Sequence, residues 1–112
     1  MNIPYDSPEL NNILEALANQ KRRGMVHELS LQPSTITKLA RQFELSLPAI
    51  HKHISFLEEA KLIIRKKAGR TNFIALDQDT LKLAQSWFAQ YQTHWGTNKN
   101  ATLENYISSL QE

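Results

Sequence analysis

The spacing of apolar residues changes once along this chain of 112 residues, and that change restricts the folds open to it. Before Lys61, apolar residues recur every three or four positions, as they do on amphipathic helices. After Lys61 the period falls to two in the runs 62–67 and 72–76, with a short turn at 68–71 that contains Gly69. The sequence therefore predicts helices followed by one β-hairpin.

Two short helices are expected immediately before this hairpin. The first begins at Ser34 or Thr35, which can cap it. Its apolar face consists of Ile36, Leu39, Ala40 and Phe43. The second follows a tight break at 44–46, is capped by Ser46 and has Pro48 in its first turn, where proline is tolerated. Its buried stripe is expected to consist of Ile50, Ile54 and Leu57.

Further helices flank this central segment, and we expect one domain over 1–112. Ser7 and Pro8 begin a helix at 7–18, and a second helix covers about 20–30 despite Gly24. The segment 32–34 is expected to be a loop. Asp77 or Asp79 begins a long helix that reaches about Trp95, and a last short helix covers 101–111. The helices at 7–18, 78–95 and 101–111 are expected to form a dimer interface.

The composition excludes several classes of protein. The sequence contains no run of 18 apolar residues, the length needed to span a membrane, and its first ten residues do not resemble a secretory signal. Without cysteine, the chain has neither disulfides nor a thiolate metal site. It has no glycine-rich phosphate loop and no recognisable serine, histidine and acid arrangement, so we expect no enzyme. A cytoplasmic location fits these features.

Positive charge is concentrated in the middle of the chain. The net charge is −1 over residues 1–33, +5 over 34–70 and −2 over 71–112. A basic block of this kind attracts polyanions and releases their counterions, although a solvated surface would look the same. The +5 segment coincides with the two short helices and the hairpin.

That order of elements is the plan of a winged helix-turn-helix, and the predicted fold class is mostly α with a small β-hairpin. In this plan the second short helix enters the major groove of DNA, and the hairpin, or wing, reaches the neighbouring backbone. We therefore predict a sequence-specific DNA-binding regulator whose motif covers residues 34–76. A winged helix that binds a partner protein is the alternative, but such domains usually lack a basic wing.

The sequence also resembles the ArsR/SmtB-type bacterial repressors. The resemblance rests on LANQKRR at 17–23, on TITKLARQFELSLPAIHKHISFLEEAKLIIRKKAGRTNFIAL at 35–76 and on the aromatic helix after it. SLPAIHKHISFLEEAKLI is its most specific part, because it is similar to the family's recognition helix running into the first wing strand. The LAN-x-x-RR pattern resembles a metal-independent branch. The resemblance implies repression. Glu44 departs from it where the turn commonly has glycine, so either Glu44 adopts positive φ at a cost of roughly 1 kcal/mol or the turn differs slightly.

Candidate DNA contacts lie on the recognition helix and the wing. His51 and Lys52 can donate to guanine or phosphate oxygens, and Leu47 can touch a thymine methyl, although Lys52 could equally meet phosphate alone. His53 matches a family histidine for which structural support and DNA contact are equally open. Arg70 at the wing tip is the best candidate for the minor groove. The full predicted set is Ser46, Leu47, Pro48, His51, Lys52, His53, Ser55, Arg65, Lys67, Arg70 and Thr71.

The resemblance also raises the question of a signal. Family members often bind metals through cysteines or through Asp and His on the dimer helices, and His94 lies too far from Asp79 to match the second pattern. We expect no metal and no cofactor, while a small-molecule effector stays unknown. The apolar face of the long helix could form a pocket, but a homodimer interface is the simpler interpretation. The predicted interface residues are Leu10, Leu14, Leu83, Trp87, Phe88, Tyr91 and Trp95.

Overall fold

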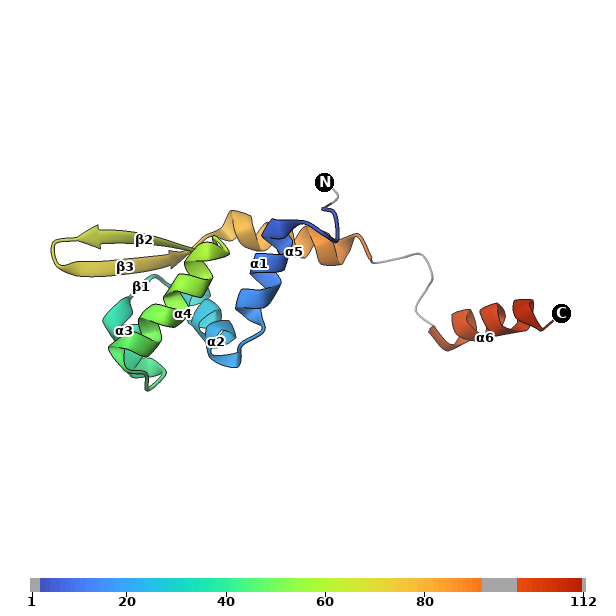
Figure 1. Ribbon diagram of the computed structural model, residues 1–112, viewed down its shortest axis with the longest axis horizontal. Helices are drawn as coiled ribbons and strands as arrows, with labels where there is room; N and C mark the ends of the chain where they lie inside the picture. Colours follow the sequence, from blue (N-terminus) through green and yellow to red (C-terminus); the bar gives the residue numbers. More distant parts are fainter. Residues whose placement is uncertain (1–2, 92–98, 112) are drawn as a thin grey trace.

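The computed structural model describes residues 3–91 and 99–111. Figure 1 shows an elongated molecule with the hairpin at one end and helix α6 at the other, apart from the remaining helices. The elements in chain order are α1 (Pro8–Leu17), α2 (Gln20–Leu31), β1 (Ser34–Thr35), α3 (Ile36–Gln42), α4 (Leu47–Glu59), β2 (Ile63–Ala68), β3 (Thr71–Leu76), α5 (Gln78–Ala89) and α6 (Lys99–Leu110). The predicted fold class, mostly α with a winged helix-turn-helix, is confirmed.

Side-chain caps set the starts of the helices. The oxygens of Ser7 and Ser46 accept from the backbone N–H of the third residue beyond them, as the sequence predicts. Where the sequence left two candidates open, the structure selects Thr35 for α3 and Asp77 for α5. Asn19 caps α2 in the same way. These caps fix where each short helix begins, so they also fix the turn between α3 and α4.

The sheet has three antiparallel strands in the order β1-β3-β2. Strand β1 pairs Ser34 with Ile74, so the loop predicted at 32–34 is wrong at its last residue. Strands β2 and β3 pair from Ile63 with Leu76 out to Ala68 with Thr71. The predicted turn at 68–71 therefore shortens to two residues, and the wing is a little longer than expected.

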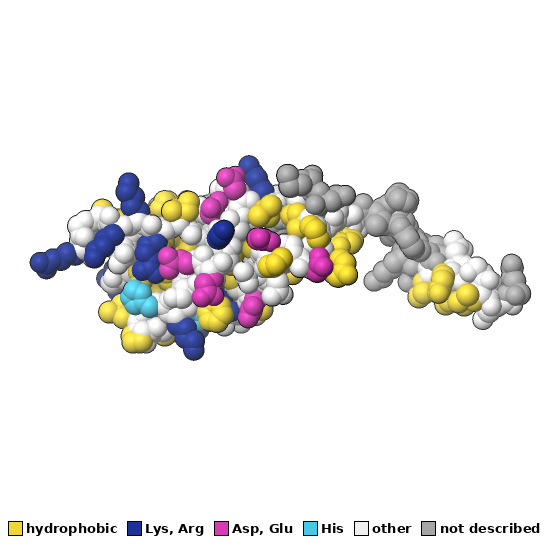
Figure 2. All heavy atoms as spheres, turned by 45° about the horizontal axis from the view of Figure 1, so that its top comes forward, with side chains coloured by type: hydrophobic (Ala, Val, Ile, Leu, Met, Phe, Trp, Pro, Cys, Tyr) yellow, Lys and Arg dark blue, Asp and Glu magenta, His cyan; other side chains and the backbone are white. Residues whose placement is uncertain are grey.

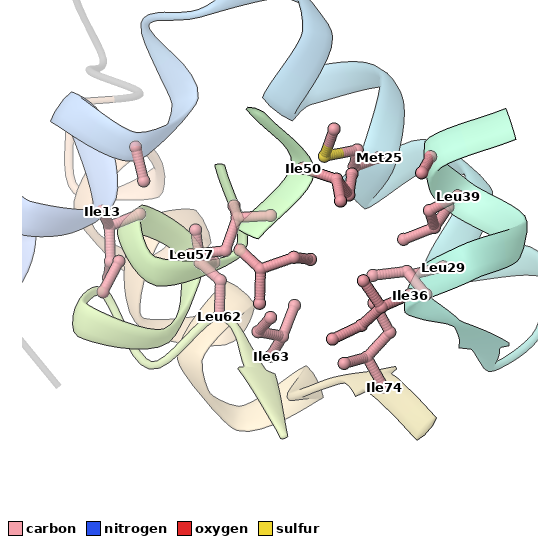
Figure 3. Packing of buried hydrophobic residues seen from close by; sticks show 14 of the residues in the cluster. Ile13, Met25, Leu29, Ile36, Leu39, Ile50, Leu57, Leu62, Ile63 and Ile74 are labelled. Atoms are coloured by element: carbon pink, nitrogen blue, oxygen red, sulfur yellow. The ribbon is translucent and has the colours of Figure 1, made fainter. Parts of the chain in front are cut away.

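A single hydrophobic core joins the helices to the base of the sheet (Figure 3). The stripe Ile50, Ile54 and Leu57 on α4 is fully buried, as predicted from its spacing. This stripe fixes the rotation of α4 about its axis, so the opposite side of the helix must face solvent. The other fully buried large side chains are Ile13, Met25, Leu39, Leu62 and Ile74.

Gly24 in the middle of α2 has a packing reason. A Cβ built at this position would lie 2.7 Å from Cε1 of Phe43, which is too close for any side chain. The absence of a side chain at Gly24 therefore lets the Phe43 ring, at the end of α3, rest directly against α2. Glycine costs about 1 kcal/mol of helix propensity at this position, and a larger residue would have to displace the Phe43 ring.

The helix after the hairpin is shorter than predicted. Helix α5 ends at Ala89, whereas the sequence predicted continuation to about Trp95. Trp95 itself lies outside the described residues, so its predicted interface role is not addressed by the structure. Leu10 is also corrected, because only 2% of its surface is exposed and its side chain belongs to the interior of this protomer.

Among residues 3–91 and 99–111, two residues other than glycine have positive φ, and both end a helix. Glu44 has φ +53° after α3, and Lys61 has φ +60° after α4. In each case the next N–H reaches back five residues, from Leu45 to the Ala40 carbonyl at 2.8 Å and from Leu62 to the Leu57 carbonyl at 3.0 Å. These are Schellman-type ends, which favour glycine at the left-handed position. The positive φ expected at Glu44 is thus present.

Replacing Lys61 by glycine should therefore stabilise the protein. Lys61→Gly removes the Cβ clash of the left-handed conformation, and we expect the free energy of unfolding to rise by about 1 kcal/mol. Lys82→Gly, at an exposed position inside α5, is the matched control and should lower it by about 1 kcal/mol. Urea titration of the three proteins tests this, and a Lys61→Gly protein no more stable than the parent would contradict it.

Candidate DNA-binding surface

The exposed side of α4 carries most of the predicted contacts. Leu47, Pro48, His51, Lys52 and Ser55 are all exposed. Pro48, Lys52 and Ser55 lie opposite the buried stripe, whereas Leu47 is exposed in the first turn of the helix. Ser46 stands at the amino end of α4, where its hydroxyl accepts from the Ala49 N–H at 3.3 Å. Side chains with donors and a leucine methyl group are thus presented together, as reading base edges in a major groove requires.

Two of the predicted contacts on α4 are constrained within the protein. The Ser55 hydroxyl donates to the His51 carbonyl at 3.0 Å, so it retains only acceptor capacity toward a ligand. His53 is half-buried, and its Nδ1 lies 3.4 Å from Nη1 of Arg22. Burial lowers the pKa of His53 first, and the nearby charges of Arg22, Lys21 and Lys52 lower it further. His53 is therefore neutral near pH 7.

The wing presents its cations at the end of the molecule farthest from α6. Lys66, Lys67 and Arg70 are exposed, and Gly69 forms the turn with φ +64°. In Figure 2, Lys and Arg side chains gather at this end, whereas acidic side chains gather over the middle of the molecule. We call Lys66, Lys67 and Arg70 the wing cations. Thr71, which follows them, is exposed as well.

Arg65 differs from the wing cations. Its Nη2 donates to Oε1 of Glu58 on α4 at 2.6 Å, and the side chain is 29% exposed. The charge of Arg65 is therefore largely compensated by Glu58, and the pair joins the base of the wing to the recognition helix. The sequence predicted Arg65, like Lys67, as a DNA contact, but the pattern of a strand does not reveal an acid on the preceding helix.

The sequence also missed the contacts of Arg22. This side chain is buried, and its guanidinium lies 4.3 Å from the centroid of the Phe56 ring on α4. Its neighbour Arg23 is exposed and donates only to the Leu17 carbonyl, at 2.8 Å. Of the two arginines in the LAN-x-x-RR pattern, Arg22 is therefore the one that packs inside the protein.

A second exposed surface is apolar and lies on α5. Leu83, Phe88 and Tyr91 are exposed, and Trp87 packs edge-on against Phe88 and Tyr91 with centroids 5.1 Å apart in both pairs. Leu14 on α1 is partly exposed too. Helix α6 carries four more exposed apolar side chains, Leu103, Tyr106, Ile107 and Leu110. Large apolar groups on a small domain usually mark an interface.

Within residues 3–91 and 99–111, no three His, Cys, Asp or Glu side chains are grouped closely enough to hold a metal ion. Over the same residues, none of the helices combines the length and apolar character needed to cross a membrane.

Comparison with known proteins agrees with this geometry. Residues 19–65 match the family described as "Bacterial regulatory protein, arsR family", a segment that runs from the cap of α2 into β2. The crystal structure of an ArsR family transcriptional regulator has a TM-score of 0.75 and 33% identity, over 88% of this chain and all of that one. HlyU from Vibrio cholerae, at 22% identity and a TM-score of 0.64, covers 81% of this chain and all of its own length, and supports the fold alone.

Two relatives with assigned roles are also similar. The HTH-type transcriptional regulator Rv2034 of Mycobacterium tuberculosis is 34% identical over 65% of this chain and 66% of its own length. The transcriptional repressor SdpR of Bacillus subtilis is 24% identical over 73% of this chain and 91% of its own. Fold, basic wing and relatives together define a winged helix-turn-helix transcriptional regulator, not an enzyme. The chain belongs to the ArsR family.

Proposed function

We propose that this chain is a repressor that binds a palindromic operator as a homodimer. The proposal is carried by the presence of two surfaces on one unit. The exposed side of α4 and the wing cations both belong to the winged helix-turn-helix, on elements that a common core holds together. Contacts between the wing and the DNA phosphates would set the position of the protein, and side chains of α4 would read the bases. The name of the Bacillus subtilis relative, a transcriptional repressor, supports repression.

The homodimer would form through the apolar surface on α5. A twofold axis there would present two copies of α4 about one helical turn apart, roughly 34 Å, so that they read successive major grooves. Leu83, Phe88 and Tyr91 supply apolar area that a lone protomer leaves in water. Leu14 on α1 would extend the interface, because α1 packs beside α5 (Figure 1).

Signal sensing by this chain would not use metal. The family's cysteine-type metal site needs thiolates, and the sequence contains no cysteine. We therefore propose a regulator whose binding to the operator is controlled by a small molecule or by the concentration of the protein itself.

Selection of bound duplexes from a random pool tests the proposal directly. We expect a palindrome with half-sites about 10 base pairs apart, and an affinity that falls steeply as salt rises. Enrichment of no sequence, together with an affinity that does not depend on salt, would overturn the DNA-binding proposal and favour a partner protein. A single unrepeated half-site would overturn the homodimer only.

His51 is predicted to read bases. His51→Ala should change the preferred base at one position of each half-site, with a loss of about 1–3 kcal/mol on the parental operator and little loss on the best new one. The matched control is His27→Ala, since His27 is exposed on α2 and outside the predicted contact set. Repeating the duplex selection with both variants measures the effect. An equal loss on every sequence would remove His51 from the base-reading residues.

A further inference from the structure

Arg22 connects two helices that the proposed function assigns to different tasks. Toward α1, its Nε donates to the Ala16 carbonyl at 2.7 Å and its Nη2 donates to the Glu15 carbonyl at 3.3 Å. These carbonyls lie in the last turn of α1, where helical partners run out and the helix dipole favours a cation. One edge of the guanidinium thus closes the carboxyl end of α1.

The other side of the same guanidinium holds α4. Nη1 of Arg22 lies 3.4 Å from Nδ1 of His53, and the guanidinium carbon lies 4.3 Å from the centroid of the Phe56 ring. His53 and Phe56 are three residues apart on α4, so they are neighbours on one side of that helix. A single buried side chain therefore touches α4 at two points and α1 at two more.

We propose that Arg22 is a positioning residue for DNA binding, whose guanidinium, clamped between the end of α1 and the pair His53–Phe56, sets the orientation of α4. The proposal rests on the proposed function, because α4 has to be the helix that meets DNA. Arg22 need not touch DNA for this role. Since α1 packs against α5, the clamp also links the proposed dimer surface to the recognition helix.

The shape of the side chain is essential to this clamp. Only a planar group with five N–H donors reaches two carbonyls and an imidazole while stacking on a ring, and a lysine ammonium at the same place keeps the charge without that geometry. Arg22→Lys should therefore weaken binding to the selected operator by about tenfold, the size expected for residues coupled by direct contact. Arg23→Lys is the matched control, because Arg23 also donates to the end of α1 but is exposed and not buried against α4.

The protonation of His53 gives a measurement that distinguishes the two roles of Arg22. A purely structural role of Arg22 would not make operator affinity depend on the charge of His53. Arg22 can only donate, so Nδ1 of His53 accepts and the neutral ring carries its proton on Nε2. Protonation would place a second N–H and a positive charge against the guanidinium. Burial already lowers the pKa of His53, as do Arg22 and Lys21 from α2 and Lys52 from α4. Below that lowered pKa, the contact between Nη1 of Arg22 and Nδ1 of His53 should be lost.

The two possible roles of His53 predict opposite effects of acid. If His53 positions α4 through Arg22, operator affinity falls as pH drops through the pKa of His53, which lies below the ordinary histidine value of about 6.5. If His53 instead contacts a phosphate, its new charge makes affinity rise. His53→Gln keeps an acceptor but cannot titrate, so it should lack this component of the pH profile, whatever its affinity at pH 7.5. Subtracting its profile from that of the parent removes the contribution of the other histidines.

The experiment measures operator affinity by fluorescence anisotropy from pH 5 to 8 for the parent, Arg22→Lys, Arg23→Lys and His53→Gln, with thermal unfolding of each. Support would be a loss of affinity at pH 7.5 for Arg22→Lys but not for Arg23→Lys, with the folded state retained at the assay temperature, together with a loss in acid that His53→Gln abolishes. An Arg22→Lys protein with parental affinity, or an affinity that rises on acidification in the difference profile, would overturn the positioning role. If Arg22→Lys does not fold, the His53→Gln comparison still decides. Failure of the parent to select any operator would instead overturn the proposed function.

Discussion

Removing the wing cations should weaken binding to every duplex by a similar factor. In the triple variant Lys66→Gln, Lys67→Gln and Arg70→Gln, the three exposed charges of the wing are neutralised and β2 and β3 keep their pairing. Each lost charge-assisted contact with a phosphate is worth about 1 kcal/mol or more, so affinity should fall by about a hundredfold or more. The selected sequence should stay the same, because phosphate contacts carry no direct sequence information.

The salt dependence gives this prediction its sharpest test. Each phosphate contact contributes about −0.9 to the slope of log affinity against log salt, so the triple variant should lose up to about three units of slope. Arg65 is left intact because it is paired with Glu58. The control is Lys61→Gln with Lys82→Gln, two exposed lysines outside the wing. A slope unchanged in the triple variant would contradict a role of the wing at the DNA backbone.

Much of this surface was predictable because it depends on local patterns. The buried stripe Ile50, Ile54 and Leu57 follows from helical spacing, and a stripe on one side of α4 leaves His51 and Lys52 on the other. The caps at Ser7 and Ser46 follow from the preference of a serine oxygen for free N–H groups at the start of a helix. Each of these features depends on neighbouring residues that are three or four positions apart in the sequence.

Three features that sequence reasoning missed depend on contacts between different elements of the fold. Strand β1 exists only because Ser34 meets Ile74, forty residues later in the sequence. The clamp of Arg22 reaches His53, thirty-one residues away, and no periodicity indicates that pair. The salt bridge of Arg65 with Glu58 crosses from a strand to the preceding helix. Spacing tells which side of an element is buried, but it does not tell which charged residue finds a partner there.

Charges on the apolar surface of α5 should separate the proposed dimer. The double variant Leu83→Glu and Phe88→Glu places two carboxylates where exposed leucine and phenylalanine side chains lie, 40% and 59% accessible. In a twofold interface each carboxylate would be buried against apolar groups or against the same carboxylate of the partner protomer. An unpaired buried charge is strongly unfavourable. We expect a dimer for the parent and a monomer for the variant in sedimentation at micromolar concentration.

The same variant should change DNA binding in a way that distinguishes dimer loss from damage to the recognition helix. Two linked copies of α4 gain about 10²- to 10⁴-fold from effective concentration, so the variant should lose that factor on the full palindrome. On a duplex with a single half-site it should bind as the parent's single copy of α4 does, because α5 does not form the α4 surface. Leu31→Glu, at a leucine 68% exposed on α2, is the matched control and should stay dimeric. A double variant that remains a dimer would exclude this surface as the interface, and equal losses on both duplexes would show that the substitutions had disturbed α4 itself.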